Sequence, residues 1–158
     1  MCDYCGCRSI GTIADLAAEH EAVLTLSSEI RSKLALGDTA TARSQFKELL
    51  AVLAPHIAKE EQGIFAELRR EGALGPYLDR LAGEHAALAA STAVLDELAD
   101  SAWSDEVAAL LDDLAAHIAI EEYDLFPASV VELAPGAWDR IARVFGSPCY
   151  PPVHEGAP

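Results

Sequence analysis

Positive charge is scarce in this sequence. Its 158 residues include 11 Lys and Arg against 26 Asp and Glu, which gives a formal net charge of −15 at pH 7. A chain this acidic lacks the cations that neutralise phosphate groups. We therefore expect it to bind neither nucleic acid nor an anionic membrane surface.

Long hydrophobic runs are also missing. The apolar stretches are short and interrupted by charged residues, so we expect no membrane-spanning segment. Residues 1–4 carry neither the basic nor the apolar part of a secretory signal, which predicts a cytoplasmic protein. In that compartment the four cysteines are expected to be reduced thiols or metal ligands rather than structural disulfides.

Runs of β-branched residues are few, whereas Ala, Leu and Glu are frequent, and this composition favours helices. The positions of Gly and Pro predict four long helices, at about 12–36, 41–70, 76–100 and 101–127, and a short fifth one after Pro135. We expect Thr12 to cap the first helix. We expect Pro55 to kink the second one, because it removes a backbone hydrogen bond.

The chain contains a two-fold internal repeat of a helix pair. Apolar residues along each helix advance by alternating steps of three and four, which is the seam of a left-handed helical bundle. The third helix repeats the seam of the first one 65 residues later, so that His85 corresponds to His20. The fourth repeats the second 61 residues later, so that His117 corresponds to His56.

These elements predict an all-α fold. Short loops between the helices favour an antiparallel up-down-up-down four-helix bundle, which we place at residues 11–132. A Cys-rich segment over 1–10 precedes it, and a short extra C-terminal helix and tail follow over 133–158. The two cysteine-containing termini are expected to be irregular.

Six ionisable residues occupy seam positions that would otherwise be apolar. They are His20, His56, Glu60, His85, His117 and Glu121. Burying so many ionisable groups is costly unless they are paired or bind metal. A lone histidine on an apolar face is usually a satisfied core residue, but six residues in register with a repeat predict a metal centre.

We predict two metal ions, each held by two histidines, with Glu60 and Glu121 bridging between them. Nitrogen and oxygen ligands without thiolate suit iron or manganese better than a structural zinc. Six protein ligands leave coordination positions open on two ions. Those positions would hold water, hydroxide or an oxygen-derived ligand.

The motifs that carry these residues resemble a known family. The pattern is His20, then the run over 56–61 (HIAKEE), then Glu84-His85, then the run over 117–122 (HIAIEE) followed by residues 125–127 (LFP). Over about residues 12–130 the chain resembles the hemerythrin-like, or HHE cation-binding, domain. The resemblance implies a non-haem di-iron centre, oxo- or hydroxo-bridged, that meets O2, peroxide or nitric oxide. It carries the six residues over as the iron ligands.

Two departures separate this sequence from the oxygen-carrying hemerythrins. Those proteins have a second histidine one turn from the third-helix histidine, where this chain has Leu81 and Ala89. Their last helix places an aspartate five residues after its histidine, whereas here the inward carboxylate is expected at the four-residue step. Glu122 and its repeat partner Glu61 are candidate supplementary ligands, and the seam geometry favours solvent-facing positions for both.

These departures open a coordination position and favour redox turnover or sensing over reversible O2 carriage. A peroxide-removing, catalase-like oxidoreductase is one candidate, without assigned catalytic residues. An O2, iron or nitric oxide sensor acting through a partner protein is the alternative, and a metal-binding bundle without redox turnover is a further one. A ferritin-like iron-storage protein is disfavoured, because no Glu lies three residues before any histidine.

The cysteines raise a separate question. Cys2, Cys5 and Cys7, with either Cys149 or His154 as the fourth ligand, could form a tetrahedral zinc site, since an up-down-up-down bundle brings the chain ends to one side. A redox-active disulfide and an inert tail are the alternatives.

Overall fold

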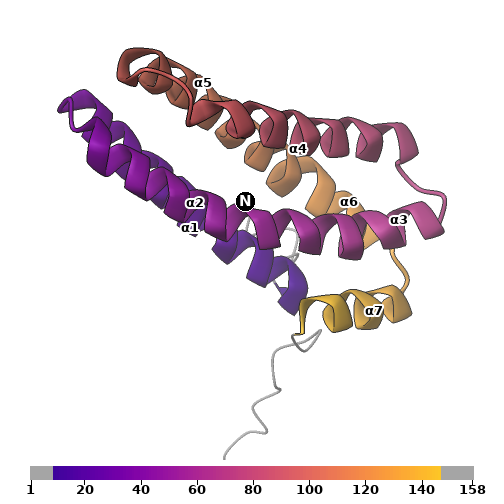
Figure 1. The fold of residues 1–158 in the computed structure, drawn as a ribbon. Helices are drawn as coiled ribbons and strands as arrows, with labels where there is room; N and C mark the ends of the chain where they lie inside the picture. Colours follow the sequence, from indigo (N-terminus) through magenta and orange to yellow (C-terminus); the bar gives the residue numbers. More distant parts are fainter. Residues whose placement is uncertain (1–8, 147–158) are drawn as a thin grey trace, which may run out of the picture.

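A computed structural model of the chain describes residues 9–146, and these residues form helices and no strands (Figure 1). The predicted all-α fold is thus confirmed. The helices are α1 (Gly11–Ala35), α2 (Thr39–Lys59), η2 (Glu60–Phe65), α3 (Ala66–Arg70), α4 (Gly75–Leu95), α5 (Asp100–Ile120), η3 (Glu121–Leu125), α6 (Phe126–Glu132) and α7 (Pro135–Phe145). The predicted cysteine site, with His154, lies outside the described residues.

Two long helical rods consist of several segments each. One runs without a break through α2, η2 and α3, and the other through α5, η3 and α6. In both rods the central segment, η2 or η3, is a short stretch of π-helix. Pro55 lies inside α2, and the helix continues beyond it to Lys59.

Several helix ends differ from the sequence-based prediction. Thr12 does not cap α1, which begins at Gly11 with Ile10 in the capping position, and the Thr12 side chain is buried. The cap of α2 is Asp38, whose Oδ1 accepts a hydrogen bond from the backbone N–H of Thr41 at 3.2 Å. The helix predicted to reach Asp100 ends at Leu95. Of these three ends, only the start of α2 has a side-chain cap.

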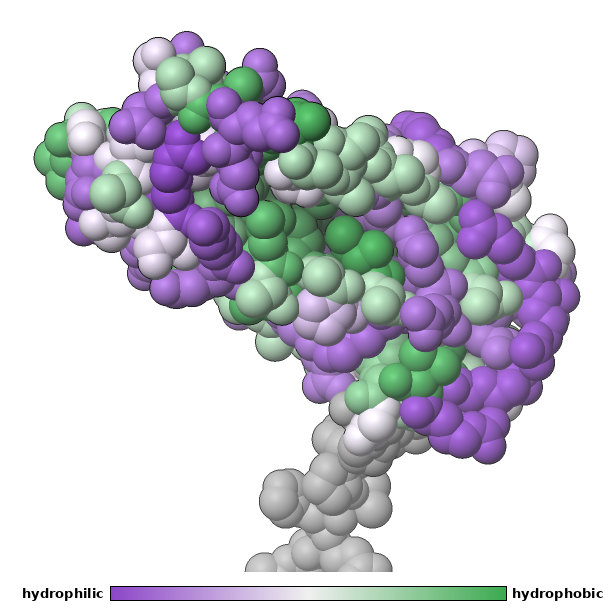
Figure 2. Space-filling view, in the orientation of Figure 1, coloured by the Kyte–Doolittle hydropathy of each residue, from purple (hydrophilic) through white to green (hydrophobic). Residues whose placement is uncertain are grey.

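The apolar core has two parts, with the six seam residues between them. One cluster includes Leu16 and Leu81. Its residues come from the start of α1, from the parts of the two rods that follow Glu60 and Glu121, and from α7, among others. The other includes Val23 and Leu114 and fills the opposite half of the bundle. In Figure 1, α1 lies beside α2, and α7 lies near the start of α1. On the face drawn in Figure 2, hydrophobic side chains gather near the middle of the molecule, and hydrophilic ones dominate around them.

The short helix α7 packs tightly on one of the π-segments. Its Trp138 is buried. Gly63 in η2 allows this approach, since a Cβ atom there would lie only 2.8 Å from Cε1 of Phe145. Arg140 donates hydrogen bonds to both carboxylate oxygens of buried Glu67. The α7 helix therefore holds the rod at the position where it carries Glu60.

Among the helices within residues 9–146, none is long and apolar enough to cross a membrane.

Candidate metal centre

The six seam residues converge in the middle of the bundle. They come from six elements: α1 carries His20, α4 carries His85, and the two rods supply the remaining four, His56 (α2) and Glu60 (η2) from one and His117 (α5) and Glu121 (η3) from the other. All six side chains are buried, and both glutamates are 0% exposed. The histidines form two pairs, with ring centroids 4.5 Å apart for His20 and His56 and 4.7 Å apart for His85 and His117.

Glu60 presents one oxygen to each histidine pair. Its Oε1 lies 3.7 Å from Nε2 of His20 and 3.3 Å from Nε2 of His56. Its Oε2 lies 3.6 Å from Nε2 of His85. A carboxylate in this position can bridge two cations, one in each half of the centre.

Glu121 repeats this arrangement with the roles of the two pairs exchanged. Its Oε2 lies 3.3 Å from Nε2 of His20. Its Oε1 lies 3.1 Å from Nε2 of His117 and 3.8 Å from Nε2 of His85. The internal repeat of the sequence therefore appears as a pseudo-two-fold relationship between the carboxylates of Glu60 and Glu121.

This donor set fits metal cations. All four carboxylate oxygens of Glu60 and Glu121, together with Nε2 of His20, are buried and have no hydrogen-bond partner. Unsatisfied buried polar atoms are costly, so five of them at one point indicate a missing ligand. Two ligands at about 2.1 Å from a common ion and at right angles lie about 3 Å apart, which is close to the observed separations. One group of residues that could hold an ion is His20, His56, Glu60 and Glu121, and a second is His85, His117 and Glu121.

A second layer of carboxylates orients all four imidazoles. The Nδ1 atom of His56 lies 2.9 Å from Glu19, and that of its repeat partner His117 lies 2.7 Å from Glu84. The other two histidines have equivalent partners. Nδ1 of His20 lies 3.3 Å from Oε1 of Glu122, and Nδ1 of His85 lies 3.0 Å from Oε1 of Glu61. An N–H at Nδ1 that donates to a carboxylate leaves Nε2 unprotonated, which is the form that binds a metal ion.

The structure corrects the position predicted for Glu122. This residue does not face solvent: it is 9% exposed and contacts His20. Its repeat partner Glu61 is partly solvated, with a side chain 42% exposed, but it also contacts a histidine. Neither of the metal-ion groups includes Glu61 or Glu122.

The π-segments explain why the seam geometry did not predict the contacts of Glu61 and Glu122 with histidines. Glu60 and Glu61 are the first residues of η2, and Glu121 and Glu122 are the first residues of η3. A regular α-helix would turn the second glutamate of each pair away from the axis. The wider π-turn changes the direction of the side chains, so that both glutamates of a pair can reach a histidine. Short π-segments of this kind often mark functional sites.

Sequence reasoning missed Glu19 and Glu84. A signal was available, since each directly precedes a histidine and the two occupy matching positions of the repeat. The periodicity places them beside the inward stripe, where a carboxylate usually meets solvent. Contact with a histidine of a neighbouring helix became visible only in the folded chain.

Two phenylalanines form apolar walls of the centre. Phe126 stacks on His20, and its repeat partner Phe65 stacks on His85, each with ring centroids 5.7 Å apart. Ser27 donates a hydrogen bond to the carbonyl oxygen of Val23 in its own helix, and Tyr123 is exposed. The phenylalanines keep water away from the imidazole rings on one side of the centre.

Electrostatics in the metal-free centre favour protons on His56, His117 and Glu60. Burial lowers the pKa of His56, but contacts with Glu19 and Glu60 outweigh burial and raise this pKa to about 10. Burial likewise lowers the pKa of His117, and the carboxylate of Glu121 reverses the effect and raises it to about 9. Burial and the neighbouring charge of Glu121 raise the pKa of Glu60. Cations that bind here must therefore displace protons.

The departures from oxygen-carrying hemerythrins persist in the folded chain. Leu81 is fully buried in the apolar cluster beside α7, and Ala89 is exposed. Neither position adds a nitrogen ligand to the centre.

Comparison with known proteins gives one match. The family model of the hemerythrin HHE cation-binding domain matches residues 11–129. No curated protein and no solved structure matches the chain. The match spans both repeats and all six residues of the centre, and the chain belongs to the hemerythrin HHE cation-binding domain family.

Proposed function

We propose that this chain is a non-haem di-iron protein that binds or reacts with O2, peroxide or nitric oxide, with a redox role rather than O2 carriage. The observation that carries the proposal is the position of Glu60 and Glu121. Each offers one oxygen to each histidine pair, and none of these four oxygens has a hydrogen-bond partner. The proposal includes the antiparallel up-down-up-down order of the bundle, which gives this symmetric donor set.

The chain's own residues would prepare the centre in three ways. The four outer carboxylates accept a hydrogen bond from Nδ1 of each histidine and fix its tautomer. Glu60 and Glu121 supply negative charge at the point where two cations would lie. Phe65 and Phe126 exclude water from two of the imidazole rings. Bound iron would supply the redox chemistry, accepting electrons from a small ligand that is oxidised or donating them to one that is reduced.

A redox role is favoured because each ion would have few protein ligands. The histidines divide two and two, and Leu81 and Ala89 leave no further imidazole on α4. Coordination positions thus remain for a small molecule. Peroxide removal, in which two H2O2 give two H2O and one O2, suits such a centre because it needs no outside electron donor.

The test is peroxide consumption by iron-loaded protein, measured as O2 release with an electrode. Catalytic release that is lost in Glu60→Gln but kept in Glu132→Gln, an exposed glutamate in α6, would support an enzyme. Iron-loaded protein that binds nitric oxide or O2 but releases no O2 from peroxide would instead support the binding-protein or sensor alternative.

A further inference from the structure

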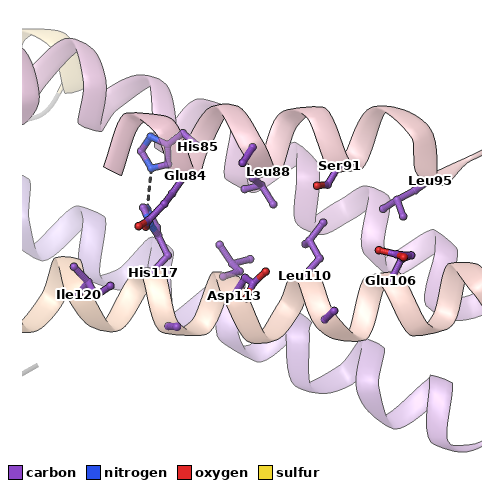
Figure 3. A pocket seen from close by; sticks show the side chains of 14 residues that line it. Glu84, His85, Leu88, Ser91, Leu95, Glu106, Leu110, Asp113, His117 and Ile120 are labelled. Atoms are coloured by element: carbon purple, nitrogen blue, oxygen red, sulfur yellow. Dashed lines mark hydrogen bonds and ion pairs between the residues drawn. The ribbon is translucent and has the colours of Figure 1, made fainter. Parts of the chain in front are cut away.

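One half of the candidate metal centre is open to solvent along a groove. A cavity of about 400 Å³ lies between α4 and α5, and His85 and His117 are among its lining residues. Figure 3 shows side chains of these two helices facing each other along this groove, with the two histidines toward one end. None of its lining residues comes from α1 or α2.

The histidines on the groove side are also more exposed than those on the other side of the centre. His85 and His117 are 5% and 9% exposed, whereas their repeat partners His20 and His56 are 1% and 2% exposed. The repeat makes the two pairs equivalent in sequence, so the difference comes from how closely the helices approach on each side.

The groove borders a second cavity that lies in the centre itself. A second, much smaller void of about 10 Å³ is lined by His56, Glu60 and Glu121, among others. The void and the groove share four lining residues, which are His85, Leu88, Leu114 and His117. At this size the void is at the lower limit for one water molecule. Leu88 and Leu114 thus stand between an open groove and a space beside both bridging carboxylates.

The chemistry of the groove indicates which molecules would use it. Leu110 and Leu114 contribute to an apolar lining, and exposed Glu106 and Asp113 lie at its edge. The 14 lining residues include no Lys or Arg. An apolar passage with acidic edges favours small uncharged molecules and repels anions.

We infer that small uncharged ligands reach the metal pair through the groove between α4 and α5, on the side of His85 and His117, and that Leu88 and Leu114 form the gate that selects them by size. This inference rests on the proposed function for the presence of the metal pair. The inequivalence of the two histidine pairs is a property of the chain and can be tested without metal.

The first test uses the metal-free full chain and diethyl pyrocarbonate, a small neutral reagent that modifies unprotonated imidazoles. Peptide mass spectrometry after short exposures gives the modification rate of each histidine. We expect His85 to react about tenfold faster than its repeat partner His20, which corresponds to about 1.4 kcal/mol in access free energy. Equal rates for His85 and His20, or a faster His20, would overturn the inference whether or not the chain binds iron.

The second test uses iron(II)-loaded protein and nitric oxide, with the association rate measured by anaerobic stopped-flow absorbance. Ala87 lines the groove, and its repeat partner Ala22 on α1 is also exposed but lies outside it. Ala87→Trp should slow association about tenfold and Ala22→Trp should leave it unchanged. Equal effects of the two variants at equal iron content would contradict the route.

The gate is tested in the same assay by two cavity-forming variants. Leu114 borders both the groove and the void, whereas its repeat partner Leu53 borders only the void. Leu114→Ala should speed nitric oxide association several-fold, and Leu53→Ala should not. The same acceleration in both variants would show that the size of the void alone sets the association rate, and it would contradict the proposed gate.

The charge selectivity is tested with azide as a small anionic probe. The double variant Glu106→Gln, Asp113→Asn should speed azide association and leave that of nitric oxide unchanged. An unchanged azide rate at low ionic strength would overturn the role of the acidic edge.

Discussion

Nδ1 of His20 lies 3.3 Å from Oε1 of Glu122, a residue 102 positions further along the chain. The contact joins α1 to the π-segment η3, and it has a repeat counterpart in the contact between His85 and Glu61 in η2. Each π-segment thus supplies one glutamate for the centre of the bundle and one that orients a histidine on a different helix. The orientation of His20 and His85 therefore depends on the tertiary fold, and not only on their own helices.

The first prediction concerns this outer carboxylate. Glu122→Gln should weaken metal binding by about 10- to 100-fold, because the amide is a weaker acceptor for the Nδ1–H of His20. Competition with a chelator of known affinity measures the change. Glu97→Gln, an exposed glutamate remote from the seam, serves as the control and should bind metal like the unmodified chain.

The bridging carboxylates should behave differently from the outer ones. Glu121→Ala and Glu60→Ala should each lose metal and the optical charge-transfer bands of the loaded protein, because each removes a donor that both ions would share. His117→Ala should have the same result. Absorption spectra and metal content of the purified variants check this, and a Glu122→Ala protein that is emptier than Glu121→Ala would reverse the assignment of inner and outer glutamates.

The sequence predicted the helical class and the six inward residues because both depend on periodicity. His20, His56 and their repeat partners lie on seams whose three-four steps can be counted directly. The outer layer was harder to predict, because Glu19 and Glu122 act on histidines of other helices. The prediction for Glu122 was wrong because it assumed a regular α-helix. Residue propensities do not predict where a π-helical turn will occur.

The contact between Gly63 and α7 gives a third prediction. Gly63→Ala should destabilise the protein by about 1–3 kcal/mol, because the new Cβ would meet Phe145 at 2.8 Å and force α7 to shift. Gly83→Ala in α4 is the matched control: its added Cβ meets nothing within 4 Å, so this helical position should gain up to about 1 kcal/mol. Urea unfolding of the three proteins gives both values, and equal stabilities of the two variants would contradict the tight packing of α7.

Stability of the metal-free protein should depend on pH in a direction set by the histidines. The pKa values of His56 and His117 are raised to about 10 and about 9 in the folded chain, above their usual value of 6.5. Folding therefore favours the protonated imidazoles, and this stabilisation is complete below pH 6.5 and is lost as the pH rises through the folded values. Thermal unfolding of metal-free protein should show a falling Tm between pH 6.5 and 10.

Two variants separate this effect from general alkaline unfolding. In metal-free His56→Gln and His117→Gln the fall in Tm over this pH interval should be smaller than in the unmodified chain. An identical pH profile for all three proteins would show that these histidines do not hold extra protons.

The central claim is a centre for two iron ions held by the six seam residues. Elemental analysis of protein purified from iron-supplemented cells, expressed as metal atoms per chain, tests it most directly. We predict about two irons per chain, and an additional zinc only if the cysteine segment outside residues 9–146 binds metal. Zinc alone, or no metal in a well-folded chain, would contradict the claim.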